Sequence, residues 1–179
     1  AMDSCTALAE ATARRSGDSL ALARAFVLLP TTWDVFGDTA TIRHARQRFA
    51  WAIGFHHRHG NTEDLAEALY WFGCNAAFNT TADSLNHALA LFEQAGNKSG
   101  MAMCLGYRFQ YEPYVSDPER TLMDQRRAAV LAEEDGNLLW TMTLHGNLGW
   151  SLMERGQYAP AMAASLRAAV RADPPAVWT

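Results

Sequence analysis

Apolar residues recur along the chain at spacings of three and four, which is the period of an amphipathic α-helix. The clearest example lies between residues 138 and 173, where a glycine separates two such runs. The first run places His145, Leu148, Gly149 and Leu152 on one face, and the second, which begins at Tyr158, does the same with Ala161, Ser165 and Ala168. Because glycine readily adopts the left-handed conformation that closes a helix, Gly156 is expected to end the first run. The stretch therefore predicts a helical hairpin with small residues between its helices.

The rest of the chain repeats this hairpin at intervals typical of two-helix repeats. A glycine followed by a small polar residue occurs at intervals of 43, 36 and 40 residues, at Gly17-Asp18, Gly60-Asn61, Gly96-Asn97 and Gly136-Asn137. Alanine stands eight places before each glycine, at Ala9, Ala52, Ala88 and Ala128. A small residue thus recurs where neighbouring helices would touch. Arg108 falls in an otherwise apolar register position, so we expect either a rotation of the helix or a guanidinium that extends along its apolar stem.

The pattern predicts about nine helices with no strand between them. Two form the hairpin within residues 138–173, and the other seven are expected at 2–16, 20–29, 39–59, 62–78, 83–95, 100–112 and 118–134. Asp83 and Asp117 are predicted N-caps, the latter with Pro118 in the first turn. Residues 31–38 are expected to form a loop whose Trp33 and Phe36 fold back on the core. We therefore predict an all-α, right-handed α-solenoid of about four hairpins, as a single domain over residues 1–179 that belongs to a longer protein.

Composition narrows the function classes. The chain has 179 residues, of which 49% are apolar and 19% charged, with a formal charge of −4. That balance excludes a disordered chain and disfavours direct binding of nucleic acid or anionic lipid. No apolar run approaches the length of a membrane span, and the first helix is too charged for a signal peptide, so we expect a cytoplasmic protein. Cys5, Cys74 and Cys104 are widely spaced and odd in number, which indicates reduced, mostly buried thiols.

The first helix of each later pair would present aromatic and amide side chains to the concave face of the solenoid. The candidate binding residues are Tyr70, Trp71, Cys74, Phe78, Tyr107, Gln110, Tyr114, Asn147, Trp150 and Glu154. The alternative is that these helices are apolar on both faces because they are buried between neighbours. Tyrosine and tryptophan beside amides suit an extended peptide, a partner helix or a flat apolar small molecule. The basic residues of a clamp for C-terminal carboxylates are missing from the later three pairs, so we do not predict such a clamp.

Other groups of polar residues give weaker indications. The helix expected at 39–59 is the most basic, and its charged face is either solvated or directed at an acidic partner or a phosphate. Within it, His56 and His59 have a spacing that suits a metal, but no third ligand accompanies them. The acidic run Glu133, Glu134 and Asp135 lacks a paired acid elsewhere, and no phosphate loop or nucleophile motif occurs. We therefore predict no catalytic residue, no metal site and no cofactor.

Two resemblances sharpen these expectations. The residues Leu148, Gly149, Gly156, Tyr158, Ala161 and Ala168 resemble the tetratricopeptide repeat (TPR), although Leu152 stands where that family often has an aromatic residue and Pro174 comes about one place late. Residues 88–105 and 128–161 are similar to the helical repeats of large bacterial regulators, namely the SARP-type antibiotic-pathway regulators and the ATP-binding LuxR-type activators. In those proteins such repeats lie beside an ATPase module and a separate DNA-binding module, and are thought to sense an inducer or partner.

The resemblance implies a non-catalytic TPR-like binding or sensor domain of a bacterial transcriptional regulator. Its expected partners are a peptide, protein or small-molecule effector on the concave face and the other domains of the same regulator, with no direct contact to nucleic acid or membrane. One alternative is a constitutive interaction scaffold that self-associates as a homodimer through an uncapped end. A second alternative is a small helical metal-binding protein or enzyme built on the histidines.

Overall fold

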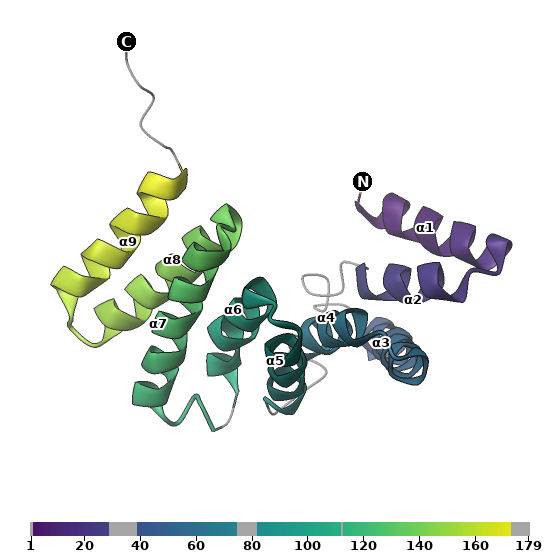
Figure 1. Cartoon of the computed structure of the whole chain (residues 1–179), viewed down its shortest axis with the longest axis horizontal. Helices are drawn as coiled ribbons and strands as arrows, with labels where there is room; N and C mark the ends of the chain where they lie inside the picture. The colour runs from purple at the N-terminus through teal and green to yellow at the C-terminus, as the bar shows by residue number, and fades with distance from the viewer. Residues whose placement is uncertain (1, 29–38, 75–81, 112, 173–179) are drawn as a thin grey trace, which may run out of the picture. The chain divides into compact units, whose positions relative to one another are not determined.

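The computed structural model describes residues 2–28, 39–74, 82–111 and 113–172 (Figure 1). Within these ranges the chain forms nine α-helices and one 3-10 helix, with no strand, so the all-α class is confirmed. The elements are α1 (Met2–Ser16), α2 (Ser19–Leu28), α3 (Thr39–His59), α4 (Thr62–Gly73), α5 (Asp83–Ala95), α6 (Lys98–Tyr107), η1 (Arg108–Gln110), α7 (Pro118–Asp135), α8 (Leu138–Glu154) and α9 (Tyr158–Ala172). None of these helices is long and apolar enough to cross a membrane bilayer.

Most helix boundaries agree with the expected ones to within one residue, and those of α4 and α6 differ by more. Helix α6 begins two residues early, at Lys98, because the side chain of Asn97 accepts a hydrogen bond from the Gly100 N–H at 2.8 Å and so caps the first turn. It ends at Tyr107, where the chain tightens into η1. Helix α4 ends at Gly73 with Cys74 as its C-cap, and residues 75–78 of its predicted extent, including Phe78, lie outside the described residues. The predicted loop at 31–38, with Trp33 and Phe36, lies outside them as well.

The chain falls into two compact units, Ala1–Leu91 and Phe92–Thr179. In the first, α1 packs on α2, α2 on α3 and α3 on α4, while α2 also touches α4. In the second, α6 packs on α7, α7 on α8 and α8 on α9, while α6 also touches α8. The two runs of helices, α1 to α4 and α6 to α9, are therefore packed alike: each helix contacts the next one in its run, and one helix also contacts the next but one.

The glycine turns predicted from the sequence are local devices that end one helix and start the next. Gly17, Gly60, Gly96, Gly136 and Gly156 all have φ between 67° and 74°, the left-handed conformation that ends a helix. After four of them an Asp or Asn side chain accepts a hydrogen bond from a backbone N–H three residues on, at Asp18, Asn61, Asn97 and Asn137. Asp117 caps α7 in the same way, with Pro118 in the first turn as predicted. Asp83, in contrast, is itself the first residue of α5, whereas an N-cap residue directly precedes the first residue of its helix.

Small residues occupy the contacts between helices, as the register predicted for three of its four alanines. Ala52, Ala88 and Ala128 are fully buried, whereas Ala9 is exposed. In the α8–α9 hairpin, a Cβ built on Gly149 would lie 2.6 Å from Ser165 Oγ and 3.3 Å from the Ala161 carbonyl oxygen. The hairpin contact predicted between residues 149, 161 and 165 is therefore confirmed.

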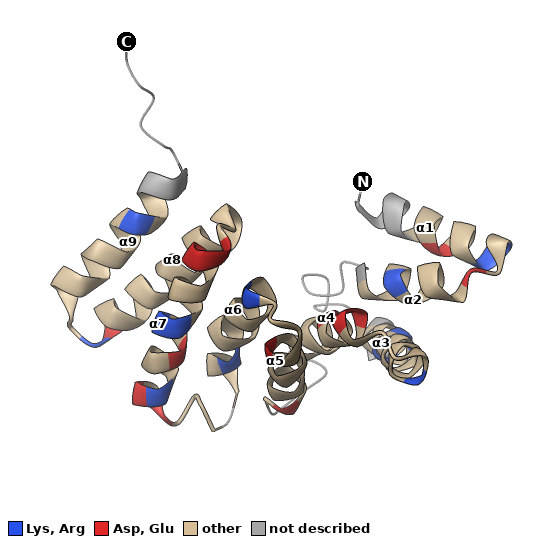
Figure 2. Ribbon diagram, viewed as in Figure 1, with Lys and Arg blue, Asp and Glu red and all other residues tan. Residues whose placement is uncertain are grey.

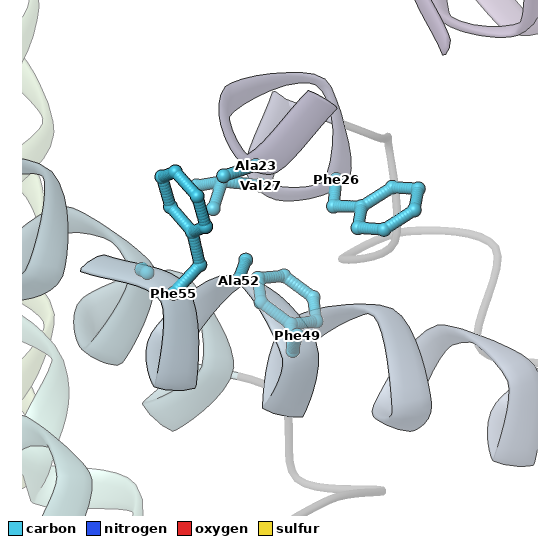
Figure 3. Close-up of a cluster of buried hydrophobic side chains, with 7 residues drawn as sticks. Ala23, Phe26, Val27, Phe49, Ala52 and Phe55 are labelled. Carbon is cyan, nitrogen blue, oxygen red and sulfur yellow. The ribbon is translucent and has the colours of Figure 1, made fainter. Parts of the chain in front are cut away.

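The core of the first unit is aromatic and aliphatic (Figure 3). Phe26 and Val27 of α2 face Phe49 and Phe55 of α3 across the fully buried Ala23 and Ala52, and Ala68 of α4 completes the cluster. The alanines bring the helices close, and the aromatic rings fill the space on either side of them. This packing fixes α2, α3 and α4 relative to one another.

We predict opposite effects for alanine at two helical glycines. A Cβ at Gly100 in α6 would lie 2.4 Å from two ring atoms of Phe92, a buried side chain that cannot bend away, so Gly100→Ala should lower the free energy of unfolding by about 1–3 kcal/mol. Gly146 in α8 has no neighbouring atom within 4 Å of a Cβ, so Gly146→Ala should raise it by about 0.4–1 kcal/mol. Urea unfolding of the full chain measures both. Equal effects of the two substitutions would contradict the tight α5–α6 contact.

Candidate functional site

The second unit contains a pocket of about 460 Å³ formed by η1, the turn before α7, and helices α7 and α8. We call it the Trp150 pocket. Both apolar and polar side chains line it. The lining residues are Phe109, Tyr114, Val115, Pro118, Thr121, Gln125, Asn147, Trp150, Ser151, Glu154 and Arg155. Four of the ten candidate binding residues, Tyr114, Asn147, Trp150 and Glu154, are brought together here.

The remaining two candidates of this unit lie outside the pocket lining. Tyr107 is half-buried at the end of α6, with its ring edge-on to Trp140 at 6.0 Å between centroids. Gln110 is exposed in η1. The predicted register assumed that α6 runs on as a regular helix to residue 112. Because α6 ends at Tyr107 and the chain continues as the 3-10 helix η1, Gln110 does not follow the α-helical register that the sequence predicted.

The candidates of the first unit do not form an open face among the described residues. Tyr70 is only 1% exposed, so its side chain belongs to the core, and Trp71 is half-buried with its ring edge-on to Tyr70 at 5.0 Å. Burial raises the pKa of the Cys74 thiol to about 12 and outweighs the opposing hydrogen bond from Tyr70. The thiol therefore stays protonated at neutral pH and is a poor nucleophile or metal ligand. Tyr70 is therefore a core residue and not part of an open binding face.

The buried wall of the Trp150 pocket is held by two arginines. The Arg108 guanidinium donates to both carboxylate oxygens of Asp124, at 2.7 and 2.8 Å, and its central carbon lies 4.4 Å from the centre of the Tyr114 ring. The Arg120 guanidinium lies 4.5 Å from the same ring and donates to the Tyr114 hydroxyl at 3.3 Å. Cations over an aromatic face are attracted to it. The ring of Tyr114, 2% exposed, is thus a fixed part of the pocket wall and not a mobile surface aromatic.

Gln125 of α7 is the least expected member of the pocket. Its side chain is 2% exposed, and its amide oxygen has no hydrogen-bond partner among the described residues. Leaving a buried polar atom unpaired costs about 1–3 kcal/mol. Because a primary amide has both donor and acceptor groups, it can pair with a peptide group or with another ligand that offers a hydrogen-bond donor. The sequence did not single out Gln125, since a buried glutamine and a solvated one look alike in a helical pattern.

The rim of the pocket combines one large apolar surface with charge. Trp150 is 61% exposed, which is unusual for so large an apolar side chain. Arg155, at the end of α8, donates to Glu119 at 2.8 Å and to the Pro118 carbonyl oxygen, and so ties α8 to the start of α7. Glu154 is exposed beside it. The exposed indole and the buried side chain of Gln125 thus line the same pocket.

A second pocket, of about 260 Å³, lies in the first unit and is lined by Arg24, Val27, His56, Asp64 and Glu67. We call it the His56 pocket. His56 is 1% exposed, and neither ring nitrogen has a hydrogen-bond partner among the described residues. Burial lowers the pKa of His56 from 6.5; the charges of Asp64 and Glu67 oppose this shift, whereas Arg24 and His59 add to it. The imidazole is therefore neutral at pH 7.

The basic face predicted on α3 borders a third pocket. Helix α3 contains arginines and histidines but no acidic residue (Figure 2), and its Arg48 lines a pocket of about 330 Å³ together with Arg14 and Trp51. Glu10 accepts from both arginines, at 2.9 Å from Arg14 and 2.8 Å from Arg48. Whether this face meets an acidic partner stays a prediction. His56 and His59 do not converge on one point: the His59 ring stacks on Phe55, and its Nδ1 lies 2.8 Å from the Phe55 carbonyl oxygen.

One further buried histidine links two helices of the second unit. His145 of α8 is 3% exposed, and its Nε2 lies 2.8 Å from the Glu133 carboxylate on α7. In the sequence, residue 145 falls in an apolar register position, and Glu133 belongs to an acidic run without a paired acid elsewhere. Neither residue lines the Trp150 pocket or the His56 pocket, so the pair serves to join α7 to α8.

Comparison with known proteins adds no relative. No protein-family model matches the chain, and no curated protein matches it either.

Within the described ranges no group of three His, Cys, Asp or Glu side chains is placed to hold a metal ion. The features of this chain that indicate a function are therefore the two pockets and their unpaired polar atoms.

The lowered pKa of His56 predicts a pH-dependent stability. Below pH 6.5 the unfolded chain binds a proton at residue 56 before the folded chain does, so the folded state loses stability as the pH falls from 6.5 toward the folded-state pKa. The loss amounts to at most about 1.4 kcal/mol for each pH unit. His56→Gln should reduce the difference in unfolding free energy between pH 7.5 and pH 5.5. His57→Gln, at the exposed neighbour, is the control, and an equal change in both variants would refute the assignment.

Proposed function

We propose that this chain is a non-catalytic binding domain of TPR-like helical hairpins, and that it recognises an extended peptide segment of a partner protein at the Trp150 pocket. The repeated glycine turns, and the successive contacts within α1 to α4 and within α6 to α9, support a stack of hairpins in which each hairpin completes the core of its neighbour. The contacts of α2 with α4 and of α6 with α8 are those that a solenoid makes between successive repeats. The proposed architecture is a right-handed α-solenoid.

The observation that carries the proposal is the unpaired amide oxygen of Gln125, buried in a pocket whose rim is the exposed Trp150. A peptide offers a backbone N–H at intervals along its length, and one such group can satisfy this oxygen. The half-buried amide of Asn147 on the next helix provides a second donor and acceptor. Trp150 can cover an apolar peptide side chain, as tryptophan does at protein interfaces. Amides from two helices beside an indole fit a peptide better than a wholly apolar ligand.

The resemblance to bacterial regulators supplies a biological setting for this binding. In that setting the domain is the sensor of a transcriptional regulator, and a bound peptide or protein favours one arrangement of the helices, which neighbouring domains detect.

A second candidate function, a scaffold that self-associates, is favoured by the exposed face of α9. Tyr158, Met162 and Leu166 follow one another at spacings of four, on one side of the helix, and are 71%, 64% and 57% exposed. Residues of this size and spacing can pair with the same residues of a second copy about a two-fold axis. Under this candidate, Met162→Glu should shift a dimer to monomer in sedimentation velocity. A monomeric wild-type chain at 100 micromolar would eliminate it.

The peptide proposal predicts that Trp150 contributes strongly to affinity. Peptides selected from a random library on the full chain would be tested by fluorescence anisotropy. Trp150→Ala should weaken their binding by roughly 30-fold, as expected for a central interface tryptophan worth about 2 kcal/mol. Tyr158→Ala removes an exposed aromatic side chain outside the pocket and is the matched control. Equal affinities of the two variants would show that the Trp150 pocket is not the binding site.

A second variant separates binding from folding. Gln125→Met keeps the length of the side chain but removes the buried amide, so the free energy of unfolding should stay the same or rise, because no unpaired polar atom is left. Peptide affinity should nevertheless fall about tenfold, the effect of losing one buried hydrogen bond. Loss of stability without loss of affinity would indicate that Gln125 has a structural role.

A further inference from the structure

The His56 pocket is independent of the Trp150 pocket, because the two lie in different units of the chain. It lies at the contact of α2, α3 and α4, with Arg24 and Val27 on α2, His56 on α3, and Asp64 and Glu67 on α4. An imidazole 1% exposed with both nitrogens unpaired is unusual inside a protein, since buried polar atoms are nearly always hydrogen-bonded. His56 lines a pocket of about 260 Å³ that a small molecule could fill.

The hydrogen bonds around Asp64 explain why His56 is unpaired. The Asp64 carboxylate accepts from Arg24 Nε at 3.1 Å and from Arg24 Nη2 at 3.0 Å, and the Asn61 amide donates to the same oxygen. That oxygen lies 3.8 Å from His56 Nδ1, which is beyond hydrogen-bond distance. The Asp64 carboxylate is therefore already hydrogen-bonded, and Arg24 offsets its charge. Neither residue is left to form a hydrogen bond with the imidazole of His56.

Glu67 supplies the unmatched charge of the pocket. Helix α4 contains three acidic residues and no Lys or Arg (Figure 2). Glu67, one turn after Asp64, accepts from the Trp71 indole N–H at 3.4 Å, and among the described residues no cationic side chain pairs with it. With Asp64 offset by Arg24, the net charge facing the pocket is that of the Glu67 carboxylate. A cation would offset this charge, whereas an anion would be repelled by it.

We propose that the His56 pocket binds a compact organic cation with a primary ammonium group. The ammonium donates one hydrogen bond to an unprotonated nitrogen of His56 and another to the Glu67 carboxylate, and a short apolar body lies against the buried side chain of Val27. An ammonium has three donors on one atom and so can reach acceptors from two helices at once. A metal ion is a poorer fit, because no group of three metal-binding side chains converges within the described part of the chain.

Three probes of equal chain length test this proposal: n-butylammonium, n-butyrate and 1-butanol. Each is titrated at pH 7.5 into the full chain labelled with ¹⁵N, and the imidazole nitrogens of His56 are observed by long-range ¹H–¹⁵N correlation. The His56 signals are assigned by their loss in His56→Gln. We expect n-butylammonium to shift these signals with a dissociation constant in about the millimolar range, which suits a ligand of so few atoms. Butyrate and butanol should produce no saturable shift.

A pair of charge-matched variants then locates the cation. Glu67→Gln removes the carboxylate from the pocket and should weaken n-butylammonium at least tenfold. Glu63→Gln makes the same change of charge one turn earlier on α4, outside the pocket lining, and should alter the affinity less than twofold. Both residues are exposed, so both variants should fold.

The proposal is overturned if none of the probes shifts His56, if butyrate or butanol shifts it as strongly as the amine, or if the two variants weaken the amine equally. Trp150→Ala is expected to leave the titration unchanged, so failure of the peptide proposal and failure of this one can be told apart.

Discussion

A Cβ built on Gly106 would lie 2.0 Å from a methyl carbon of Leu144, so α6 and α8 can lie against each other only because residue 106 has no side chain. The same Cβ would be 3.8 Å from Ala128 of α7, a residue that is fully buried. Three helices therefore meet at one point where a glycine and an alanine remove the bulk between them. Gln125 lies three residues before Ala128, and Asn147 lies three residues after Leu144, so each is on the same face as the contact. The close approach of these helices thus brings the two amides of the Trp150 pocket to one site.

Both candidate sites share a second physical feature, a buried polar group without a partner. Gln125 in the second unit and His56 in the first are almost fully enclosed, yet each has atoms that make no hydrogen bond within the described ranges. Such atoms reduce stability by about 1–3 kcal/mol each, and departures of this kind from well-satisfied packing are concentrated at functional sites. A ligand that satisfies them recovers this energy on binding. That is the physical basis on which the two pockets are assigned a binding role.

The elements that the sequence predicted best are those fixed by local chemistry. The left-handed glycines, the Asn and Asp caps and the helix lengths depend on residues within one or two turns of each other, which a linear pattern contains. The hairpin contact at Gly149 was also predictable, because the register of one repeat defines it.

What the sequence could not give depends on residues far apart in the chain. Tyr70 lies in a helix and Tyr114 in a turn, each near other apolar residues in the sequence. Only the packed structure shows that both rings are enclosed. The Arg108–Asp124 ion pair joins residues on different elements, and it turns a side chain that breaks the apolar pattern into a support for the pocket wall. Gln125 carries no distinguishing sequence signal. Burial and pairing, which decide whether a polar residue can bind a ligand, are properties of the assembled helices.

The contact between Gly106 and Leu144 tests the account most directly, because it joins α6 to α8, the helix that carries Asn147 and Trp150 of the pocket. In a nuclear Overhauser spectrum of the full chain, the α-protons of Gly106 should give strong cross-peaks to a methyl group of Leu144. Their absence, with both resonances assigned and visible, would mean that α6 and α8 do not meet, and the site built on that contact would have to be abandoned.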